Sequence, residues 1–464
     1  MNILVFNCGS SSLKYRLLAM PEAIELTGGE AQRVGPPTAK PSVILYHVGK
    51  EKFTKEVPMA NHAAAFEEVM KLLMQDEKLR PDAVGHRLVH GGTFFRNPTV
   101  VTGDVMQKLE AIRDLAPLHN PPAMALMYAC QERYPALPQV AVFDTAFHGT
   151  IPEKAYTYAL PGAIRDELGI RKYGFHGTSH QFVMEEAAAF LKKPVAQFNA
   201  VSCHLGSGGA SLCAIVNGQS VDNTMGYSPL QGLVMSTRCG DLDPAVTMQL
   251  LAQTDGDGQK VLSLLNNKSG VLGLTGSTAD IRDVLANPLS ATGEKSARLT
   301  QTEQVYVWRL RKYLGAYLAV VGQPDAVIFT DTIGETVPQV RWAMCADMAA
   351  FGMKMDAKKN AHVTQYPTDV AAADSAVRIL VVQTNEELAI ARRTFLTLDH
   401  ASPALEREAH SSSAAEPCEK PTQVRTPANL VPSQDSVKGT PKIKRRATST
   451  QSTAESSTSK GIHA

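Results

Sequence analysis

Two stretches of the chain share one layout, in which a short apolar strand, a turn of small residues and a second apolar strand follow one another. They read ILVFNCGSSSLKYRLL over residues 3–18 and AVSCHLGSGGASLCAIVNG over residues 200–218. Converging backbone N–H groups in such turns bind anions, and Ser hydroxyls add donors. The layout predicts two related halves, each with a phosphate-binding hairpin. An ordinary Ser-rich hairpin is the competing interpretation of the first stretch, which lacks the GxxxxGK[ST] spacing of a P-loop.

Strand-like and helix-like segments alternate along most of the chain. Further strands are predicted at 42–49, 83–92, 139–144, 326–330 and 378–384, and amphipathic helices at 62–76, 179–192, 302–322 and 340–352. A third glycine-containing loop is predicted after one of these strands, in IFTDTIGETVPQVR. This mixture over 464 residues predicts an α/β protein of two domains.

The composition changes near His400. Residues 400–464 are rich in Ser, Thr, Pro and charge and poor in aromatic side chains. Such a segment cannot bury enough apolar surface to offset its chain entropy, so we expect a disordered tail.

Charge and cysteine usage disfavour several classes of protein. The net charge of +1 provides no general attraction to nucleic acid or to a membrane surface. The seven cysteines are scattered without CxxC spacing, which is typical of reduced thiols rather than of a disulfide framework. No segment has the pattern of a secretory signal or a membrane span. We expect a cytoplasmic protein that binds neither nucleic acid nor membrane.

Two arginines lie where an anion could bind. Arg87 is inside the strand predicted at 83–92, where a charge is costly unless it is paired. Arg238 lies in the loop MSTRCGDLDP, beside Asp241 and Asp243. Two guanidinium groups could clamp a carboxylate or a phosphoryl group through bidentate hydrogen bonds. For Arg238, a salt bridge to one of its acidic neighbours is the competing interpretation.

Histidines and acidic residues also occur next to predicted strands and helices. His176 and His180 have the spacing of a helical zinc pair, but the absence of an HExxH glutamate and of a cysteine partner disfavours zinc. Asp144 ends a predicted strand, at the edge where α/β proteins bind ligands. Glu386 and Glu387 begin a predicted helix, where they either complement the helix dipole or bind magnesium.

Taken as a set, these motifs resemble the acetate kinase family of the sugar kinase, Hsp70 and actin superfamily. They occur in family order over residues 1–395 and read NCGSSSLKYRL, GHRLVHGG, APLHNPPA, FDTAFHGTIPEKAYTYALP, YGFHGTSH, HLGSGGAS, NGQSVDNTMGYSPLQGLVMSTRCGDLDPA, SGVLGLTGSTADIRD, IFTDTIGETVPQVR and TNEELAIAR. The resemblance implies reversible transfer of the γ-phosphoryl group of ATP to acetate, giving acetyl phosphate and ADP, with magnesium or manganese.

The resemblance also implies roles for single residues. Arg87 and Arg238 would hold the acetate carboxylate and the migrating phosphoryl group, and His176 would donate a hydrogen bond to that group. Asp144 and Glu386 would position magnesium, with Glu387 as the substitute for Glu386 and Asn7 as a further metal contact. The phosphate and acetate contacts would be Asn7, Ser10, Ser12, Lys14, Val89, Leu118, Phe175 and Pro229. The nucleotide contacts would be His204, Gly206, Gly208, Gly209, Asp280, Ile281, Arg282, Thr332, Ile333, Gly334, Glu335 and Thr336.

The chain departs from the family pattern at the nucleotide end of the predicted site. The family usually reads GGIGEN where this chain has DTIGET, so that Asp331 and Thr332 replace glycines and Thr336 replaces asparagine. A β-branched Thr resists backbone conformations that Gly permits, and Asp331 adds negative charge. We therefore expect an active carboxylate kinase with altered nucleotide affinity. Propionate as acceptor, pyrophosphate as donor and a non-catalytic nucleotide-sensing scaffold are the alternatives.

Two ribonuclease H-like domains of the actin and Hsp70 ATPase type, facing each other across a cleft, are implied as well. The first would span residues 1–148 and be completed by a helix at 385–399, and the second would span 149–384. Residues 400–464 would form the disordered tail. Because family members are commonly homodimers, we expect a homodimer.

Overall fold

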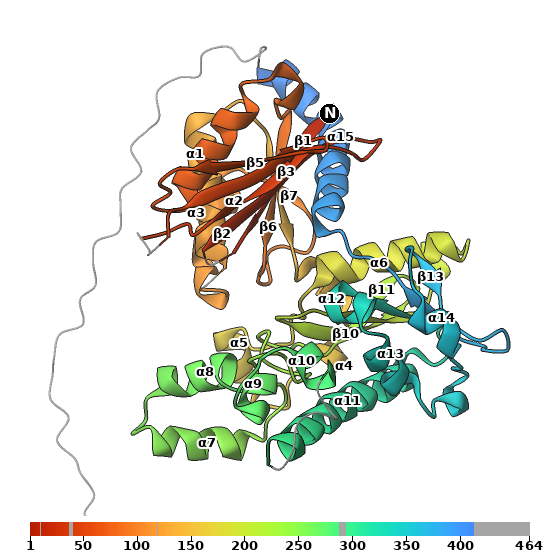
Figure 1. Cartoon of the computed structure of the whole chain (residues 1–464). Coiled ribbons are helices and arrows are strands. Elements are labelled where there is room, and N and C mark those ends of the chain that lie inside the picture. The colour runs from red at the N-terminus through yellow and green to blue at the C-terminus, as the bar shows by residue number, and fades with distance from the viewer. Residues whose placement is uncertain (10, 37–39, 118, 287–293, 413–464) are drawn as a thin grey trace, which may run out of the picture. The chain divides into compact units, whose positions relative to one another are not determined.

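The computed structural model describes residues 1–412 apart from 10, 37–39, 118 and 287–293. Residues Met1–Arg407 form one compact unit, which contains two β-sheets with helices packed against them (Figure 1). No helix of this described part is both long enough and apolar enough to cross a membrane. The six cysteines within it are free thiols.

The first sheet has the strand order β5-β4-β3-β2-β1-β6-β8-β7. Strands β1, β2 and β3 form an antiparallel meander, whereas β6 and β8 run parallel to β1. The parallel neighbours need crossovers, which contain α1 (His62–Leu73), α2 (Gly103–Ala111) and α3 (Asn120–Arg133). The strands are β1 (Asn2–Cys8), β2 (Ser12–Ala19), β3 (Ile24–Gln32), β4 (Val43–Val48), β5 (Glu51–Glu56), β6 (Ala83–Leu88), β7 (Thr99–Val100) and β8 (Gln139–Phe143).

The second sheet repeats this order as β11-β10-β9-β12-β14-β13. Again the first three strands are antiparallel neighbours, and the next two run parallel to the central strand β9. The strands are β9 (Ala200–Leu205), β10 (Ala210–Val216), β11 (Gln219–Asn223), β12 (Ala326–Thr330), β13 (Thr368–Asp369) and β14 (Arg378–Val381). Two sheets of the same ribonuclease H-like topology confirm the predicted pair of related halves. The exact domain boundaries stay predictions.

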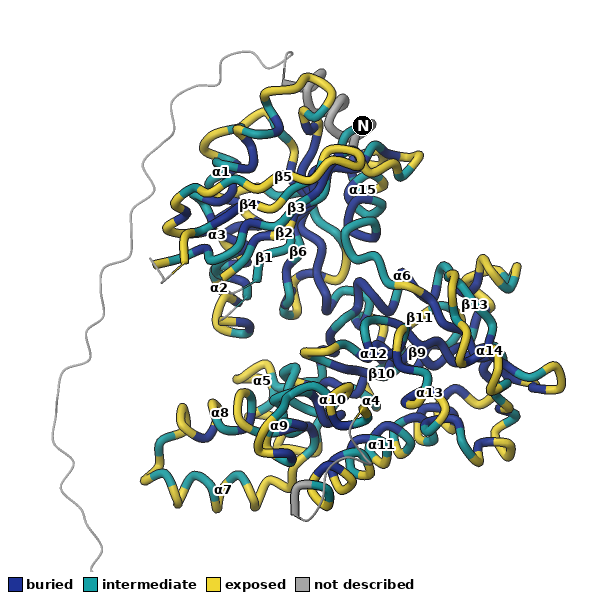
Figure 2. The backbone as a smooth tube through the Cα atoms, in the orientation of Figure 1, coloured by how far each residue is buried: buried dark blue, intermediate teal, exposed yellow. Residues whose placement is uncertain are grey.

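Helices cover both faces of the second sheet. Helix α6 (Gly177–Phe190) packs on β9 and β12 through residues such as Val183 and Ala187, and α11 (Glu294–Val321) covers the opposite face through Leu310 and Leu314. Every residue of β9 and β12 is therefore buried (Figure 2). The shorter helices are α4 (Glu153–Tyr156), α5 (Gly162–Leu168), α7 (Pro244–Gln253), α8 (Gly258–Asn267), α9 (Gly270–Thr275), α10 (Ile281–Ala286), α12 (Asp331–Thr336), α13 (Pro338–Cys345) and α14 (Ala357–Ala361).

The last helix, α15 (Glu386–Ser412), returns to the first sheet. Its Ile390 packs with Ile3 and Val5 of β1, although the two elements stand at opposite ends of the described sequence (Figure 1). Gly85 of β6 permits this approach, because a Cβ there would lie 2.5 Å from Oγ1 of Thr394 and 2.8 Å from Cγ2 of Ile390. The Asn385 side chain caps this helix by accepting a hydrogen bond from the Leu388 N–H.

Three local predictions differ from the structure. The segment DTIGET is a helix, α12, that begins directly after β12, where a loop was predicted. The helix predicted at 340–352 is divided, because α13 ends at Cys345 and a separate 3-10 turn covers Ala349–Phe351. Helix α15 continues past the predicted end at 399 to Ser412, into the first residues of the predicted tail. Residues 413–464 of that tail lie outside the described residues.

Candidate active site

Many of the predicted site residues line one cavity of about 510 Å³. They come from the ends of β1, β2, β6 and β9 and from the starts of helices α6, α12 and α15. Carboxyl ends of parallel strands and starts of helices thus meet at one place, as is usual for ligand sites in α/β proteins. The lining residues are Asn7, Lys14, Arg87, His176, His204, Gly208, Gly209, Asp331, Thr384, Glu386 and Glu387.

Arg87 is held in place by groups of opposite charge. Its guanidinium donates to the Asp144 carboxylate at 2.7 and 3.1 Å and to Oδ1 of Asn7 at 3.1 Å, and Glu386 lies 3.4 Å away. Burial by itself would lower the pKa of Arg87, but the charges of Asp144 and Glu386 raise it above its ordinary value. The group is therefore a fixed cation at the cavity wall.

Asp144 connects this cation to the second half of the chain. It follows β8, is 1% exposed, and accepts a 2.9 Å hydrogen bond from Oγ1 of Thr178 in α6. Its backbone carbonyl accepts from the Gly177 N–H at the first residue of that helix. Both carboxylate oxygens of Asp144 thus have donors, and the residue orients Arg87. Its predicted part in positioning magnesium stays a prediction.

His176 precedes α6 in a left-handed conformation, with φ of 59°. Its Nδ1 lies 2.8 Å from Oγ of Ser211, which lies 2.8 Å from Nε2 of His180, and Nδ1 of His180 is 2.9 Å from Oγ of Ser202. Burial holds the pKa values of both histidines well below the ordinary range, so both rings are neutral. A Cβ built on Gly209 would lie 3.4 Å from Nε2 of His176, which places this nitrogen against the Gly-rich turn.

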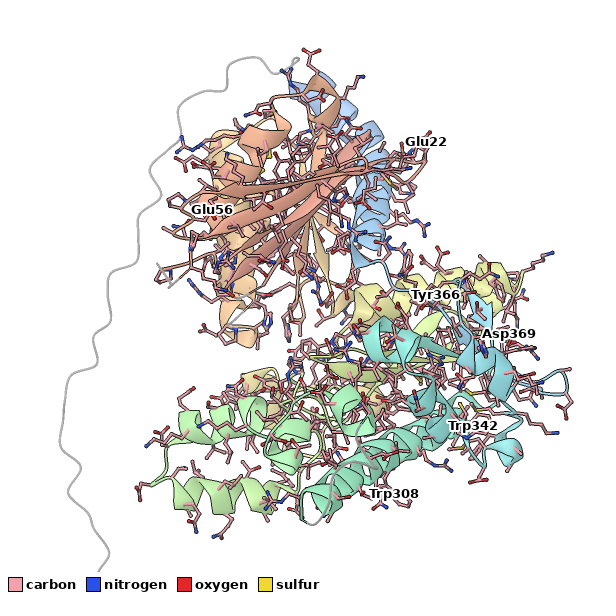
Figure 3. The ribbon with its side chains drawn as sticks, in the orientation of Figure 1. Glu22, Glu56, Trp308, Trp342, Tyr366 and Asp369 are labelled. Carbon is pink, nitrogen blue, oxygen red and sulfur yellow. The ribbon has the colours of Figure 1, made fainter. Side chains whose placement is uncertain are left out.

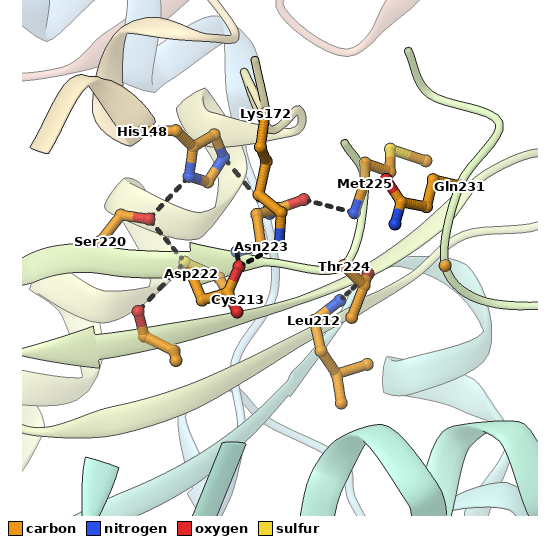
Figure 4. Close-up of polar contacts among 12 residues, drawn as sticks. His148, Lys172, Leu212, Cys213, Ser220, Asp222, Asn223, Thr224, Met225 and Gln231 are labelled. Atoms are coloured by element: carbon orange, nitrogen blue, oxygen red, sulfur yellow. Dashed lines mark hydrogen bonds and ion pairs between the residues drawn. The ribbon is translucent and has the colours of Figure 1, made fainter. Parts of the chain in front are cut away.

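A buried polar cluster contains His148, Ser220 and Asn223 (Figure 4) and fixes the backbone just before His176. The Phe175 carbonyl accepts a 3.2 Å hydrogen bond from the Asn223 side chain and lies 2.9 Å from Nε2 of His148. The other nitrogen of His148 is 2.8 Å from Oγ of Ser220. These contacts tie the segment to β11, so that the position of His176 depends on residues of the sheet rather than on its own loop alone.

Arg238 differs from Arg87 in its partners. It makes no ion pair among the described residues, and its Nη1 donates to the Pro229 carbonyl at 3.2 Å. The competing interpretation of a salt bridge to its acidic neighbours is therefore wrong, because Asp241 accepts from the hydroxyl of Tyr313 and Asp243 caps α7. Burial lowers the pKa of Arg238. The Nη1 atom would lie 3.4 Å from a Cβ on Gly209, so this guanidinium faces the same turn as His176.

The second Gly-rich turn connects β9 and β10 and is closed by a 3.0 Å hydrogen bond from the Gly206 N–H to the Gly209 carbonyl. His204, at the end of β9, lies against it with Nε2 3.0 Å from Oδ2 of Asp331 and Nδ1 2.9 Å from Oγ of Ser179. The hairpin predicted at residues 200–218 is confirmed. An acidic side chain lies beside its turn.

The remaining residues of DTIGET contact each other, Thr384, Arg341 and the hydrophobic core. One carboxylate oxygen of Glu335 accepts from the N–H groups of Asp331 and Thr384, at 2.8 and 2.9 Å. Ile333 is 1% exposed and belongs to the hydrophobic core. The Thr336 hydroxyl donates to the Thr332 carbonyl at 2.6 Å. Their predicted nucleotide contacts stay predictions.

Other predicted residues lie outside the cavity lining. Asp280 and Ile281 line a second, much smaller cavity together with Gly206 and Ile333, and Arg282 pairs with Asp280. Phe175 is buried, while Val89 is half-buried against the core. Ser12 begins β2 and is half-buried. Ser10 and Leu118 lie outside the described residues.

Local sequence patterns did not single out Thr384, Ser211 or His119 as site residues. Thr384 lines the cavity, and Ser211 contacts His176 from β10. Burial and the charges of both Arg87 and Arg238 lower the pKa of His119, which lies just before α3. The motifs APLHNPPA, TNEELAIAR and HLGSGGAS contain His119, Thr384 and Ser211 and were a signal for them, but the last motif does not indicate that Ser211 contacts His176.

The acidic groups of the cavity fit a magnesium ion that a substrate helps to hold. The described residues include no cluster of three or more His, Cys, Asp or Glu side chains that could bind a metal alone. Magnesium is usually bound by one or two carboxylates, water and substrate phosphates, and Glu386 and Glu387 both line the cavity. Burial raises the pKa of Glu386, which a bound cation would counteract.

The fold and the polar cavity define a phosphotransferase built from two ribonuclease H-like domains. The chain belongs to the acetokinase family, whose model matches residues 2–392. It is 46% identical over 400 residues to the acetate kinase of Alkaliphilus metalliredigens, covering 85% of this chain and 99% of that protein. The resemblance found in the sequence is confirmed, and the chain is a kinase that transfers phosphate to a carboxylate.

Solved structures agree with this assignment. The crystal structure of Porphyromonas gingivalis acetate kinase is 38% identical, with a TM-score of 0.79 over 86% of this chain and 99% of that one. A propionate kinase from Francisella tularensis is 35% identical, with a TM-score of 0.77 over 85% of this chain and 98% of that one.

Proposed function

We propose that the protein catalyses reversible, magnesium-dependent phosphoryl transfer between ATP and acetate, giving acetyl phosphate and ADP. The observation that carries this proposal is one cavity with Arg87, His176 and the Gly-rich turn on its walls and Arg238 directed at that turn. An acetate oxygen attacks the γ-phosphorus, the bond from that phosphorus to the β,γ-bridging oxygen breaks, and ADP leaves with the electron pair. Acetate is already an anion, so the reaction needs no general base.

The two guanidinium groups supply the positive charge that this transfer requires. Phosphoryl transfer depends on positioning and on stabilising charge at the equatorial oxygens rather than on covalent help. Asp144 holds Arg87 in a single orientation, so little reorganisation is needed when charge develops. Arg238 has no competing carboxylate among the described residues and is free to pair with the substrate. The two arginines therefore have complementary tasks.

His176 donates a hydrogen bond to the phosphoryl group through Nε2. A neutral imidazole has one N–H, so Nδ1 of His176 must then accept from the Ser211 hydroxyl. That hydroxyl has one proton, so its oxygen accepts from Nε2 of His180. Nδ1 of His180 in turn accepts from Ser202. The chain of contacts has one direction, from Ser202 to the substrate.

Magnesium, with manganese as a substitute, would be held by Glu386, with Asn7 and Glu387 on the same cavity wall. The ion supplies charge neutralisation for the donor phosphates. The Glu386 carboxylate that would hold the ion also lies 3.4 Å from the Arg87 guanidinium. Removal of divalent cations with EDTA is expected to abolish turnover, and added magnesium to restore it.

Acetate is the proposed first acceptor and propionate a second substrate. One additional methylene changes discrimination in an apolar pocket by only about 1–3 kcal/mol. A propionate kinase among the similar structures supports this breadth. Formation of acyl phosphates as hydroxamates, with acetate and propionate each paired with ATP, GTP or pyrophosphate, tests acceptor and donor together. No acyl phosphate from any pair would contradict the proposal and favour a nucleotide-sensing scaffold.

The protein is proposed to form a homodimer. Two tryptophans on α11 and α13 support this, because Trp308 is 72% and Trp342 46% exposed on one part of the surface (Figure 3). Exposed apolar side chains that gather into one patch on a folded protein commonly mark interfaces, whereas singly scattered ones do not. Sedimentation velocity is expected to give a dimer for the wild type and a monomer for Trp308→Glu. A monomeric wild type at micromolar concentration would contradict the proposal.

A further inference from the structure

Asp331 has a backbone conformation that most residues avoid. It is the first residue of α12 and has φ of 63°, in the left-handed region where Asp is tolerated but uncommon. Its N–H donates to the Glu335 carboxylate at 2.8 Å, and its Oδ1 accepts from the Thr332 N–H at 2.6 Å. Local contacts therefore hold the side chain in one direction.

That direction is toward the Gly-rich turn. Oδ2 of Asp331 lies 3.0 Å from Nε2 of His204 and would lie 2.5 Å from a Cβ on Gly206. The same cavity wall continues with Gly208 and Gly209. The Asp331 carboxylate thus lies where a turn of this type would bind a phosphate. It contacts Nε2 of His204, the nitrogen that faces the turn.

Asp331 is ionised in this position. Burial would raise its pKa, but the hydrogen bond and charge of His204 and the N–H of Thr332 lower the pKa well below the ordinary value. A fixed negative charge therefore lies next to a turn whose substrate is itself an anion. The carboxylate of Asp331 and an anionic substrate in the turn would repel each other, so binding is opposed unless the carboxylate moves away.

We propose that Asp331 lowers the affinity for the phosphoryl donor, because its carboxylate occupies the His204 side of the turn and must be displaced by the phosphate chain of the donor. This inference rests on the proposed kinase function and deepens it. Because the competition concerns phosphate and not the nucleoside, it applies equally to ATP, ADP and inorganic tripolyphosphate. It leaves the acetate side of the cavity unaffected.

Two substitutions separate the charge from the shape of this residue. Asp331→Asn keeps an oxygen that can accept from Thr332 and removes the charge, and Asn also tolerates positive φ. Asp331→Gly removes the side chain and suits the backbone. Asp347→Gly is the matched control, because Asp347 has φ of 58° and does not line the cavity.

The test is calorimetric titration of ADP and of tripolyphosphate into the full chain, together with steady-state kinetics. Both Asp331 variants are expected to bind each probe about tenfold more tightly, as for removal of a like-charge contact. The KM for ATP should fall in parallel, the KM for acetate should stay within about twofold, and Asp347→Gly should match the wild type. The gain should shrink as salt is raised, because screening weakens the repulsion.

Unchanged or weaker binding in both variants would overturn the inference, because weaker binding would mean that Asp331 helps to hold the donor. Tighter binding of ADP alone would also overturn it, since the effect would then concern the nucleoside. The titrations need no turnover. A wild type that makes no acetyl phosphate would therefore refute the proposed function while leaving the response of the variants measurable.

Discussion

Arg87 and Arg238 are both half-buried guanidinium groups, but their surroundings predict different losses of stability when each is removed. Arg87→Ala leaves the buried Asp144 and the half-buried Glu386 without their cation, which we expect to lower the free energy of unfolding by about 3 kcal/mol. Arg238→Ala leaves no acidic side chain of the described residues without its ion-pair partner. We therefore expect it to lower the free energy of unfolding by less than Arg87→Ala does. Both variants should lose at least about a hundredfold in kcat. Urea denaturation and acetyl phosphate formation measure the two effects, and equal destabilisation would contradict this difference.

Ser211 acts on His176 without touching substrate, which makes it a positioning residue. Ser211→Ala removes the donor to Nδ1 of His176, so the ring can place its proton on the wrong nitrogen. We expect kcat to fall about tenfold to a hundredfold with a small change in the KM for acetate. Ser220→Ala, which removes a similar contact to His148, is the control. Nitrogen NMR of labelled histidine should show the tautomer change only in Ser211→Ala.

At the scale of elements, the packing of α15 on the first sheet depends on one missing side chain. Gly85→Ala would push a methyl group against Thr394 and Ile390, and we expect a loss of about 1–3 kcal/mol in unfolding free energy. Gly103→Ala is the matched control, because a Cβ at Gly103 meets nothing within 4 Å. Thermal denaturation of both variants tests this. Equal melting temperatures of Gly85→Ala and Gly103→Ala would show that α15 can shift to accommodate the methyl group without a loss of stability.

Helices and strands whose own residues carry a clear hydrophobic pattern could be predicted from the sequence. Strands that form only because they pair with a neighbouring strand could not. The apolar runs of β1 and β9 and the helical spacing in α6 each carry their own signal. Strand β5, with the sequence EKFTKE, is almost entirely exposed and exists because it pairs with β4. Helix α12 was missed because Gly and Thr in its sequence favour a loop, whereas the Glu335 carboxylate closes its first turn.

The candidate site shows the same division. Arg87 and His176 could be found because each stands in a distinctive motif. The contact between His204 and Asp331 arises from pairing of β9 with β12, which sets His204 beside Thr330. The chain through Ser211 arises from pairing of β9 with β10, which sets Ser211 opposite His204. Such contacts depend on the register of the paired strands, which cannot be predicted from the residues around each contact.

At the scale of the whole molecule, buried neutral histidines occur in both halves of the chain. Burial lowers the pKa of His86, His90 and His148 from 6.5 to about 4. His86 belongs to the first sheet, and His148 contacts the second through Ser220. In the unfolded chain these rings accept protons near pH 6.5, whereas the folded protein resists protonation until about pH 4. The unfolded state therefore binds more protons across this interval, and acid favours it.

The expected result is a free energy of unfolding that is steady above pH 7 and falls as the pH drops from 6.5 to 4. Each such histidine contributes a slope of about 1.4 kcal/mol per pH unit within the interval. His86→Gln removes one titrating ring but keeps a polar group near Gln139, which lies 2.7 Å from His86. The slope of unfolding free energy against pH should therefore be smaller in this variant than in the wild type by the contribution of one histidine. Urea denaturation at pH 7, 6, 5 and 4 measures both slopes. Parallel curves for the variant and the wild type would mean that His86 is already protonated in the folded protein, against the effect of its burial.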